Sequence, residues 1–436
     1  MKPLVKSLLS ASIAAAFAVP MAAHATNGYL LPGYGAKAIG MGGVGVAYAQ
    51  DSIAAAANPA GIADVGSRAD LGFGIFNPVR SAAVGASAGG YSAYGFNQSA
   101  DSANKYYLMP SAGMTMAWDD KLTLGVALVG NGGMNTTYQP NFYNGSKIIG
   151  IDLMQLLVPI TAAYKVDEHN AIGASVVLGA QRFSARGLQS FGTFGISSTA
   201  NFFEPSKGLT NQGHDFAQGA GARVGWRGKF LNDNLTLGAT YASKVYMSKF
   251  SKYRGLFAEG GSFDVPANYA VGIAVKATPA MTVAFDVERI LYAGVPSVAN
   301  RGPNTGPLTV GIPAYANPAN KLGLENGMGF GWTNQTVYKL GVDYKYNEAW
   351  TLRAGFNYGK SPIPNDQLAF NTLAPATVEK HYTIGFTYSP DKSSEMTLAY
   401  LHAASNTQSA CGLTMITCAR ISMYQNDLEF AYSWKF

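Results

Sequence analysis

The side chains that could carry out catalysis are scattered along this chain. His24 lies near the start, His169 lies in an expected turn, and the other three histidines lie on separate strands or loops, at His214, His381 and His402. No serine, histidine and carboxylate therefore combine into a recognisable nucleophile motif. The glycines near residue 40 resemble a phosphate-binding loop only in composition, because no expected strand precedes them. We expect no enzymatic activity, no metal site and no cofactor.

Three arginines are candidates for binding an anionic head group, because guanidinium groups form charge-assisted hydrogen bonds with such groups. Arg182 and Arg186 lie at the outer end of an expected strand. Arg353 alternates with apolar neighbours in another strand, so its side chain should point to the face of that strand opposite to those apolar side chains. The alternative is that such basic residues pair with carboxylates on the same face, for which the candidates are Asp286, Glu288, Asp343 and Glu429.

A long segment between two expected strands is rich in apolar side chains. They are Phe191, Phe194, Ile196, Phe202 and Phe203. Because large exposed apolar patches usually mark binding sites, this segment could capture a hydrophobic ligand. The alternative is a local core within the loop itself.

Two cysteines, Cys411 and Cys418, lie close together in a polar segment. In an exported protein such a pair can form a disulfide. We expect a structural role for it, and two lone cysteines do not indicate a metal site.

The elements that would position all these residues are β-strands. At the C-terminus, Leu428, Phe430, Tyr432 and Trp434 alternate with Glu429, Ala431, Ser433 and Lys435. Successive side chains of a strand point to opposite faces. One face of this strand is therefore apolar and aromatic, and the other is small or polar. A series of such strands is typical of a barrel whose outer face contacts lipid.

The alternation predicts about fourteen strands, an even number as in bacterial single-chain barrels. They span 69–80, 105–118, 121–130, 155–166, 169–181, 216–227, 234–245, 264–277, 280–292, 334–347, 349–360, 380–389, 394–403 and 426–436. Short polar turns alternate with long loops, of which 182–215 and 293–333 are the longest. Short turns of such barrels face the periplasm, so both ends of the barrel should be periplasmic. Pro78, Pro110 and Pro159 predict bulges or kinks.

The composition supports a membrane protein that lacks spanning helices. Charged residues make up 13% of the chain, about half the share in soluble domains. No stretch after the N-terminal leader has the 18 apolar residues of a spanning helix, and a closed barrel is the other structure that satisfies its backbone in lipid. The net charge of +6 is spread out, so we expect no nucleic-acid partner.

The N-terminal region divides into two parts. Lys2 and Lys6, a short apolar stretch and Ala23-His24-Ala25 predict a cleaved signal peptide over residues 1–25. Residues 26–68 are rich in glycine and contain no expected strand. A fourteen-stranded barrel has a wide lumen, so we expect this segment to form a plug inside a barrel of residues 69–436. A disordered periplasmic tail is the alternative.

Several motifs of this chain resemble the FadL family of outer-membrane transporters. Those in the N-terminal segment are Thr26-Asn27-Gly28-Tyr29, Gly40-Met41-Gly42-Gly43 and Ala57-Asn58-Pro59-Ala60-Gly61. Val265-Pro266-Ala267-Asn268-Tyr269 and Ser361-Pro362-Ile363-Pro364 resemble later parts of the family, so the resemblance covers nearly the whole mature chain. It implies a fourteen-stranded barrel with an N-terminal hatch, to which Asn58, Pro59 and Ala60 would belong.

The resemblance also implies a function. Hydrophobic molecules would be captured by the outer loops, pass to a pocket in the barrel, and leave through a lateral opening at a kinked strand. Trp332, Thr333 and Asn334 stand where the family has a basic loop residue, so hydrocarbons and aromatics remain candidates beside long-chain fatty acids. We expect a monomer in contact with outer-membrane lipid. A surface adhesin or receptor is the alternative, and a polar porin is the third.

Overall fold

The computed structural model describes residues 27–86, 98–139, 142–143, 147–303, 308–309, 312–313, 318–411 and 417–436. The expected signal peptide lies outside these residues. Among the described residues, no helix is long and apolar enough to cross a membrane.

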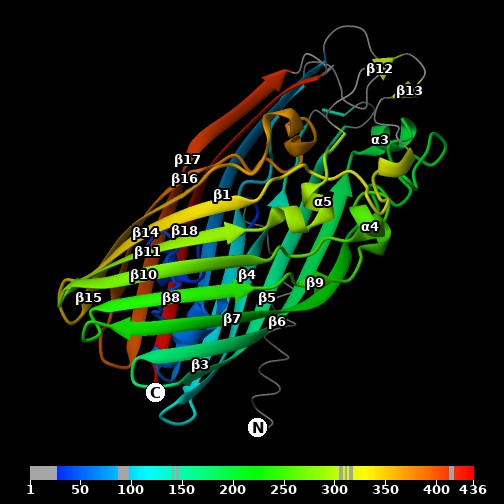
Figure 1. The fold of residues 1–436 in the computed structure, drawn as a ribbon. Helices are drawn as coiled ribbons and strands as arrows, with labels where there is room; N and C mark the ends of the chain where they lie inside the picture. Colours follow the sequence, from blue (N-terminus) through cyan, green and yellow to red (C-terminus); the bar gives the residue numbers. More distant parts are fainter. Residues whose placement is uncertain are drawn as a thin grey trace.

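Fourteen antiparallel strands of the described chain form one closed barrel (Figure 1). Neighbours in sequence are neighbours in the wall, and the last strand pairs with the first, from Arg68 opposite Lys435 to Ala86 opposite Thr417. The wall consists of β1 (Arg68–Ala86), β3 (Tyr107–Ala117), β4 (Leu122–Asn135), β5 (Gly150–Lys165), β6 (Asn170–Arg186), β7 (Asp215–Phe230), β8 (Leu235–Ala242), β10 (Asn268–Thr278), β11 (Met281–Ile290), β14 (Gln335–Lys345), β15 (Trp350–Gly359), β16 (Lys380–Tyr388), β17 (Ser394–Cys411) and β18 (Thr417–Lys435).

Shorter elements complete the fold. Two short strands extend the wall, β2 (Gln98–Asp101) on β1 and β9 (Tyr246–Met247) on β7, while β12 (Leu308–Thr309) and β13 (Ile312–Pro313) pair only with each other. The helices are α2 (Ala36–Ile39), α3 (Gln189–Thr193), α4 (Ala258–Gly261) and α5 (Pro296–Ala299). Single 3-10 turns are η1 (Ser52–Ala56), η2 (Pro59–Asp64), η3 (Ser251–Tyr253), η4 (Tyr292–Gly294), η5 (Pro318–Asn320), η6 (Asn365–Gln367) and η7 (Phe370–Thr372).

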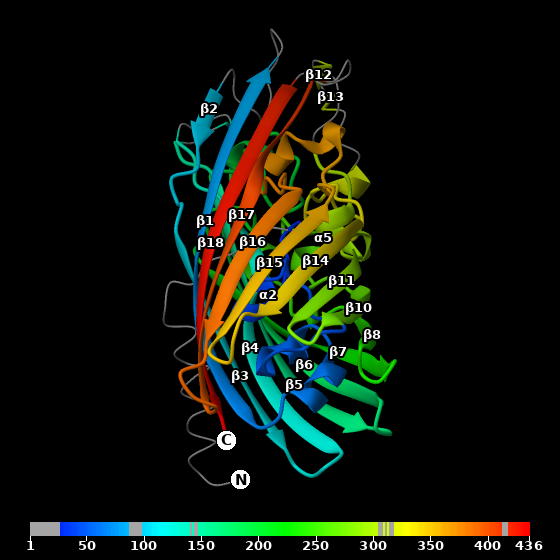
Figure 2. The ribbon, with the colours of Figure 1, turned by 90° about the vertical axis from the view of Figure 1, so that its left-hand side faces the viewer.

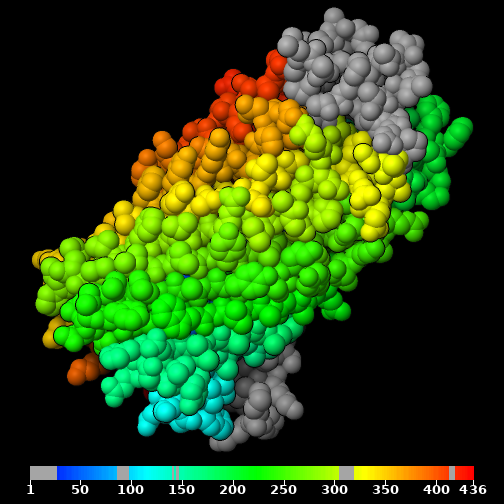
Figure 3. All heavy atoms as spheres, viewed as in Figure 1, coloured from blue at the N-terminus to red at the C-terminus, as the bar shows by residue number. Residues whose placement is uncertain are grey.

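The barrel of about fourteen strands expected from the alternation is confirmed, and each expected strand corresponds to one wall strand. The main difference is at the loop end, where β1, β6, β17 and β18 extend well beyond the expected limits. The alternation fails there because the side chains of these extensions no longer face lipid on one side. The space-filling view shows the middle strands of the wall as a continuous surface (Figure 3).

The prolines interrupt the hydrogen-bond ladder without shifting it. Pairing runs in an unbroken register through Pro78 between β1 and β18, and through Pro159 between β5 and β6. The register shift in this part of the wall lies instead between Gly130 and Gly132 of β4, where it faces β5. The expectation of a bulge is therefore wrong at Pro78 and Pro159, whereas pairing of β3 with β4 ends at Ser111, next to Pro110. A kink at these prolines stays a prediction. Glycine permits the unusual backbone at this point, since Gly132 has φ of 137°.

Residues 27–67, which we call the N-terminal segment, are enclosed by the barrel wall (Figure 2). Its backbone or side chains contact strands on opposite sides of the barrel, among them β4, β6, β7, β16 and β17. Asp51 caps the alanine-rich turn η1, as its side chain accepts a hydrogen bond from the Ile53 amide at 3.1 Å.

Candidate functional site

Inward-facing glycines let the N-terminal segment lie directly on the wall. A Cβ added to Gly355 would be 2.1 Å from the Gly42 amide nitrogen, and one added to Gly225 would be 1.9 Å from the Asn58 Oδ1. A side chain at either position would expel the segment. Similar close approaches occur at Gly113, Gly173, Gly238, Gly272 and Gly341. The small residues on the inner face of the wall thus leave the space in which this segment packs, and they occur around much of the barrel.

Asn58 fixes the middle of the segment to the wall. Its fully buried side chain donates hydrogen bonds to the Val46 carbonyl at 2.7 Å and to the Trp226 carbonyl of β7 at 3.0 Å. Its Oδ1 accepts from the Ala60 amide at 3.1 Å and so caps η2, with Pro59 in the first turn. The Asn58-Pro59-Ala60 sequence therefore joins two parts of the segment to a wall strand.

An ion network holds the segment at the periplasmic end of the barrel. The Lys37 ammonium lies 2.5 Å from the Glu395 carboxylate of β17, and Arg68 contacts the same carboxylate at 3.1 Å and Asp70 at 2.7 Å. Burial lowers the pKa of Lys37. Burial, and next the negative charge of Asp70, raise the pKa of Asp51 to about 6. Removal of one partner from a buried pair costs about 3–5 kcal/mol, so this end is firmly attached.

The first described residues form a tip that contacts both the loops and β4. The ring of Tyr29 lies 5.2 Å from that of Tyr292 and 5.7 Å from that of Trp332, and all three are buried. The Tyr292 hydroxyl donates to the Asn27 carbonyl. On the other side, the Tyr29 carbonyl accepts from the Gly133 amide of β4 at 3.0 Å.

The wall is broken next to this tip. β3 pairs with β4 only up to Ser111 opposite Val129, so among the wall strands Gly130–Asn135 pair with β5 alone, and Gly132 also forms a bridge with Leu30 of the tip. On the other side, pairing of β1 with β3 ends at Phe76 opposite Tyr107 and resumes with β2 only at Ser81. Polar side chains bridge the gap, since Arg80 and Tyr107 both hydrogen-bond to Asn135. The ladder is thus missing where β4 bends towards the tip.

Three cavities lie along the interior. One, of about 10 Å³, lies between the loops, and no charged side chain lines it; its walls include Phe183, Phe257, Met328, Phe330, Phe370 and Leu373. A second, also of about 10 Å³, lies behind the wall gap and is lined by Phe76, Pro78, Arg80, Met134, Trp332 and Met423 among others. A third, of about 20 Å³, lies between the N-terminal segment and β5–β10, where Tyr34, Asn131, Arg223 and Pro266 are among its walls.

The aromatic loop residues divide between the two alternatives. Phe191 is buried against Tyr143 and Phe370, and Phe194 packs on the same core, so these two belong to a local loop core. Phe202 and Phe203 are 70% and 90% exposed. Phe202 and Phe203 are therefore available to an external ligand. The sequence alone could not distinguish these two residues from the buried Phe191 and Phe194.

Two of the candidate arginines have carboxylate partners. Arg353 contacts Asp343 at 3.0 Å, as the pairing alternative predicted, and Arg182 contacts Asp152 at 3.0 Å, a carboxylate outside the predicted set. Lys339 and Glu288 form a similar inward pair at 2.8 Å. Arg186 is exposed at the end of β6. The structure brings Arg182 and Arg186 to the loop end and leaves Arg353 in the lower barrel, next to Gln50 of the N-terminal segment.

The remaining predictions concern the cysteines and catalysis. Cys411 and Cys418 are joined by a disulfide between β17 and β18. Within the described ranges, no group of three or more His, Cys, Asp or Glu side chains could hold a metal ion. The site contains small apolar cavities, a buried aromatic contact and a wall gap, which together form an apolar path through the loop half of the barrel.

Sequence reasoning missed the residues that join these parts. They are Tyr29, Tyr292, Trp332, Lys37 and Glu395. Their contacts span more than 250 positions of the chain, so no local pattern could have revealed them. A weak signal was available for Trp332, an aromatic residue in a glycine-rich loop.

Comparisons with known proteins agree on one family. The sequence model described as "Outer membrane protein transport protein (OMPP1/FadL/TodX)" matches residues 15–411. The toluene transporter TodX of P. putida is similar in structure, with a TM-score of 0.66, 22% identity, and 93% of this chain and 99% of that chain covered. A FadL homologue of Pseudomonas aeruginosa has a TM-score of 0.66 at 15% identity, covering 94% and 100%. The toluene transporter TbuX of Ralstonia pickettii has a TM-score of 0.60 at 19% identity, covering 93% and 99%. A sequence search of curated proteins found no match.

Proposed function

The chain belongs to the OMPP1/FadL/TodX family of outer-membrane transport proteins, and from this premise we propose that it is a passive channel for hydrophobic small molecules. Membership in the family confirms the expected outer-membrane location and a transport role in place of an enzymatic one. Two of the similar structures are toluene transporters, which supports aromatic hydrocarbons as the substrate class. The protein acts as a single chain surrounded by outer-membrane lipid.

The observation that carries the proposal is the position of the tip, residues 27–30. It lies between the aromatic loop core and the gap in the wall, and it hydrogen-bonds to both sides. A tip at this point closes the route between the loop cavity and the gap. We therefore assign the N-terminal segment as a hatch whose tip moves and whose lower part stays attached.

Capture begins at the exposed loop residues Phe202 and Phe203. Each Å² of apolar surface that a ligand removes from water contributes about 25 cal/mol. From there the ligand enters the loop cavity, which has a volume of about 10 Å³ in this conformation. A dry cavity of about 150 Å³ binds benzene, so the aromatic side chains of the loops must move apart before a single ring can enter.

Release follows through the wall. Displacement of Tyr29 from Tyr292 and Trp332 frees the way to the second cavity, which Trp332 also lines. That cavity lies behind the gap between β3 and β4, and we propose that the ligand leaves there sideways into the membrane. Rearrangement of Arg80, Tyr107 and Asn135 would widen the gap.

Neutral ligands fit this route better than anionic ones. The loop cavity has no charged lining, and Arg182 is already paired with Asp152. A fatty-acid carboxylate would have to displace Asp152 or rely on the exposed Arg186. We therefore place hydrocarbons and aromatics first and long-chain fatty acids second.

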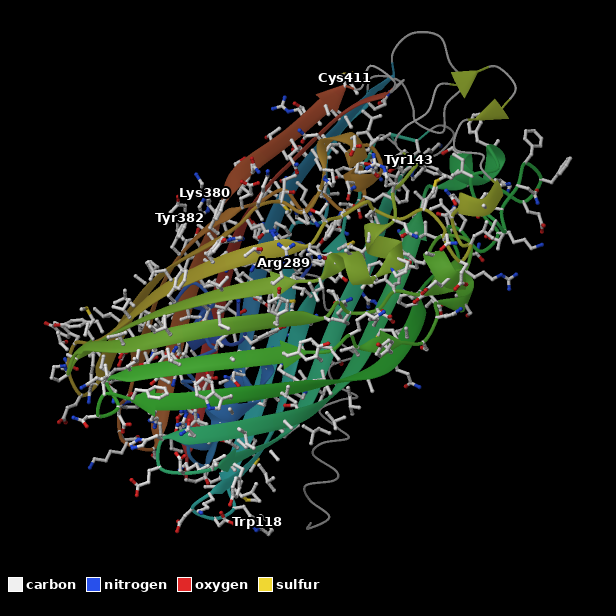
Figure 4. All side chains as sticks on the ribbon, in the orientation of Figure 1. Trp118, Tyr143, Arg289, Lys380, Tyr382 and Cys411 are labelled. Atoms are coloured by element: carbon white, nitrogen blue, oxygen red, sulfur yellow. A yellow bond between two sulfur atoms is a disulfide. The ribbon has the colours of Figure 1, made fainter. Side chains whose placement is uncertain are left out.

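The test is uptake by Gram-negative cells that lack their own hydrophobic channel. Labelled toluene, oleate and a labelled sugar are compared with and without the protein. We expect faster toluene uptake, a smaller gain for oleate and none for the sugar. Phe202→Ser with Phe203→Ser should slow toluene uptake at low concentration, whereas Trp118→Ser, an exposed aromatic at the opposite end of the barrel (Figure 4), should not.

The alternatives predict other outcomes of the same assay. A gain for the sugar would indicate a polar porin. If a folded barrel gives no gain for any of the three compounds, the exposed Phe202 and Phe203 would favour the adhesin or receptor.

A further inference from the structure

Three basic side chains point outward at the loop ends of β11, β15 and β16, which lie within four consecutive strands of the wall. In β11 the buried Asp286 and Ile290 face the lumen, so Arg289 faces outward by alternation. The same reasoning places Lys380 outward, because His381 is fully buried. Lys360 directly follows β15, two residues beyond the outward Tyr358, and is exposed.

The pairing register makes these residues neighbours. Arg289 lies opposite Thr336 of β14, whose hydroxyl accepts a hydrogen bond from its guanidinium at 2.6 Å. Lys380 lies opposite Tyr358 of β15. Lys360 comes between them, since Gly359 pairs with Val337, the residue after Thr336. Arg289 and Lys380 both lie between the turn of Trp118 and the end of β17 at Cys411 (Figure 4).

Aromatic side chains lie just below, on the lipid-facing surface. Tyr338 and Tyr382 are both about half exposed, and Tyr346 marks the other end of β14. Eight residues at about 3.3 Å each, tilted by about 40°, separate Tyr346 from Tyr338 by roughly 20 Å along the membrane normal. An apolar band is about 25 Å tall and has aromatic residues at both edges. The three cations thus lie at the level of the outer head groups.

Charge distinguishes this region from the other end of the barrel. The periplasmic turns mix exposed Asp119, Asp167, Glu348 and Asp391 with exposed Lys121, Lys276 and Lys345. Near the three outer cations, in the part of the chain that the structure describes, the neighbouring carboxylate is that of Glu379. Its Oε1 already accepts a hydrogen bond from the Ser361 amide at 3.0 Å.

We propose that Arg289, Lys360 and Lys380 bind the phosphate groups of a phosphorylated lipid in the outer leaflet. Cations at this level attract anionic head groups, and the tyrosines below would contact the start of the acyl chains. The lysines act as flexible point charges, whereas Arg289 is held along the wall by Thr336. This site lies on the outside of the barrel and does not depend on the proposed transport.

Binding of fluorescent diphosphorylated lipid A to the purified barrel in detergent tests the proposal. The variant carries Arg289→Gln, Lys360→Gln and Lys380→Gln. The control carries Lys121→Gln, Lys276→Gln and Lys345→Gln, which removes the same charge from the periplasmic end. Each basic residue near an anionic surface contributes about fivefold to binding. We expect the outer variant to lose on the order of 10- to 100-fold in affinity and the control to lose little.

Two further measurements keep the result interpretable. Dephosphorylated lipid A should bind the unaltered barrel as weakly as the outer variant binds the phosphorylated form. Lys360→Arg with Lys380→Arg should retain binding, because the charge stays. Equal binding of the two lipids, or an equal loss in the periplasmic control, overturns the proposal. Heat-resistant migration of each variant on a gel confirms that the barrel is folded.

Discussion

Substitution of Asn58 by alanine is the most direct perturbation of the N-terminal segment. The side chain is fully buried and makes three hydrogen bonds, to Val46, to Trp226 and from Ala60. Alanine removes all three and leaves two buried carbonyls and one amide without these partners. The barrel ladder is untouched, because the strands pair without this side chain.

The expected loss follows from these contacts. An N-cap contributes about 1 kcal/mol, and each of the other two hydrogen bonds contributes about 1 kcal/mol. The sum of about 3 kcal/mol lowers the ratio of docked to undocked segment by roughly 150-fold, at about 1.4 kcal/mol per tenfold. Local opening of the segment should become that much more frequent, while global unfolding of the barrel changes little.

Hydrogen exchange measured by mass spectrometry on the barrel in detergent reports this opening. Peptides that cover residues 44–63 of Asn58→Ala should exchange on the order of 100-fold faster. Asn58→Ser keeps an acceptor for the cap, so about two thirds of the free-energy loss is expected. The matched control is Asn371→Ala, which also removes three hydrogen bonds of a buried asparagine, but in the loops: one accepted from the Trp332 indole and two donated to the carbonyls of Phe330 and Gln367.

Two results would refute the reasoning. One is unchanged exchange in residues 44–63 of Asn58→Ala in a folded barrel, because the docked state would then not depend on these bonds. The other is an equal increase in the exchange of residues 44–63 in Asn371→Ala, which would mean that loss of buried hydrogen bonds elsewhere in the protein loosens the segment as well. Asn58→Ala should also impair transport, because the middle of the N-terminal segment is no longer fixed to the wall.

Three further predictions concern the two ends of the segment. Glu395→Gln should accelerate exchange of residues 34–43 more than Lys37→Met, because Arg68 and Lys435 still neutralise Glu395 when Lys37 is lost. Asp51 has a folded pKa of about 6, above its ordinary value of 3.8, so its contribution to docking is complete below about pH 4 and is lost as pH rises through 6. Protection factors, in which the intrinsic pH dependence of amide exchange is divided out, should therefore be higher for residues 51–57 at pH 5 than at pH 7.5, and Asp51→Asn should remove the difference. Gly132→Ala would place a Cβ 1.7 Å from the Tyr29 carbonyl, so it should displace the tip, accelerate exchange of residues 27–33 and raise toluene uptake.

Each of these predictions has a contrary outcome. Equal effects of Glu395→Gln and Lys37→Met would mean that Arg68 and Lys435 do not stabilise the carboxylate once Lys37 is lost. A pH dependence that persists in Asp51→Asn would assign it to another group. For Gly132→Ala the control is Gly66→Ala, because Gly66 also has a positive φ, of 72° against 137° at Gly132, but has no atom within 4 Å of the new Cβ. If both variants have the same effect, strain and not displacement of Tyr29 is the cause.

The wall of the barrel could be predicted because its signal is local. Lipid imposes an apolar side chain at every second position, so β10 or β18 is recognisable from its own residues. The prediction failed where that constraint ends, at the loop halves of β1 and β17. The kink in β4 was missed for the same reason, since Gly130–Gly133 are small residues in a strand and the shift depends on the tip that contacts them.

The path of the N-terminal segment was nevertheless encoded in the strands. Gly225 and Gly355 face the lumen in the middle of their strands, where glycine weakens a sheet and often marks the close approach of another backbone. The alternation gave these positions as merely small or polar. Their common requirement is space, because Asn58 and Gly42 occupy the volume that a Cβ would need. Inward glycines of a barrel strand therefore indicate a docked segment, and replacement of either one by alanine should expel it without breaking the wall.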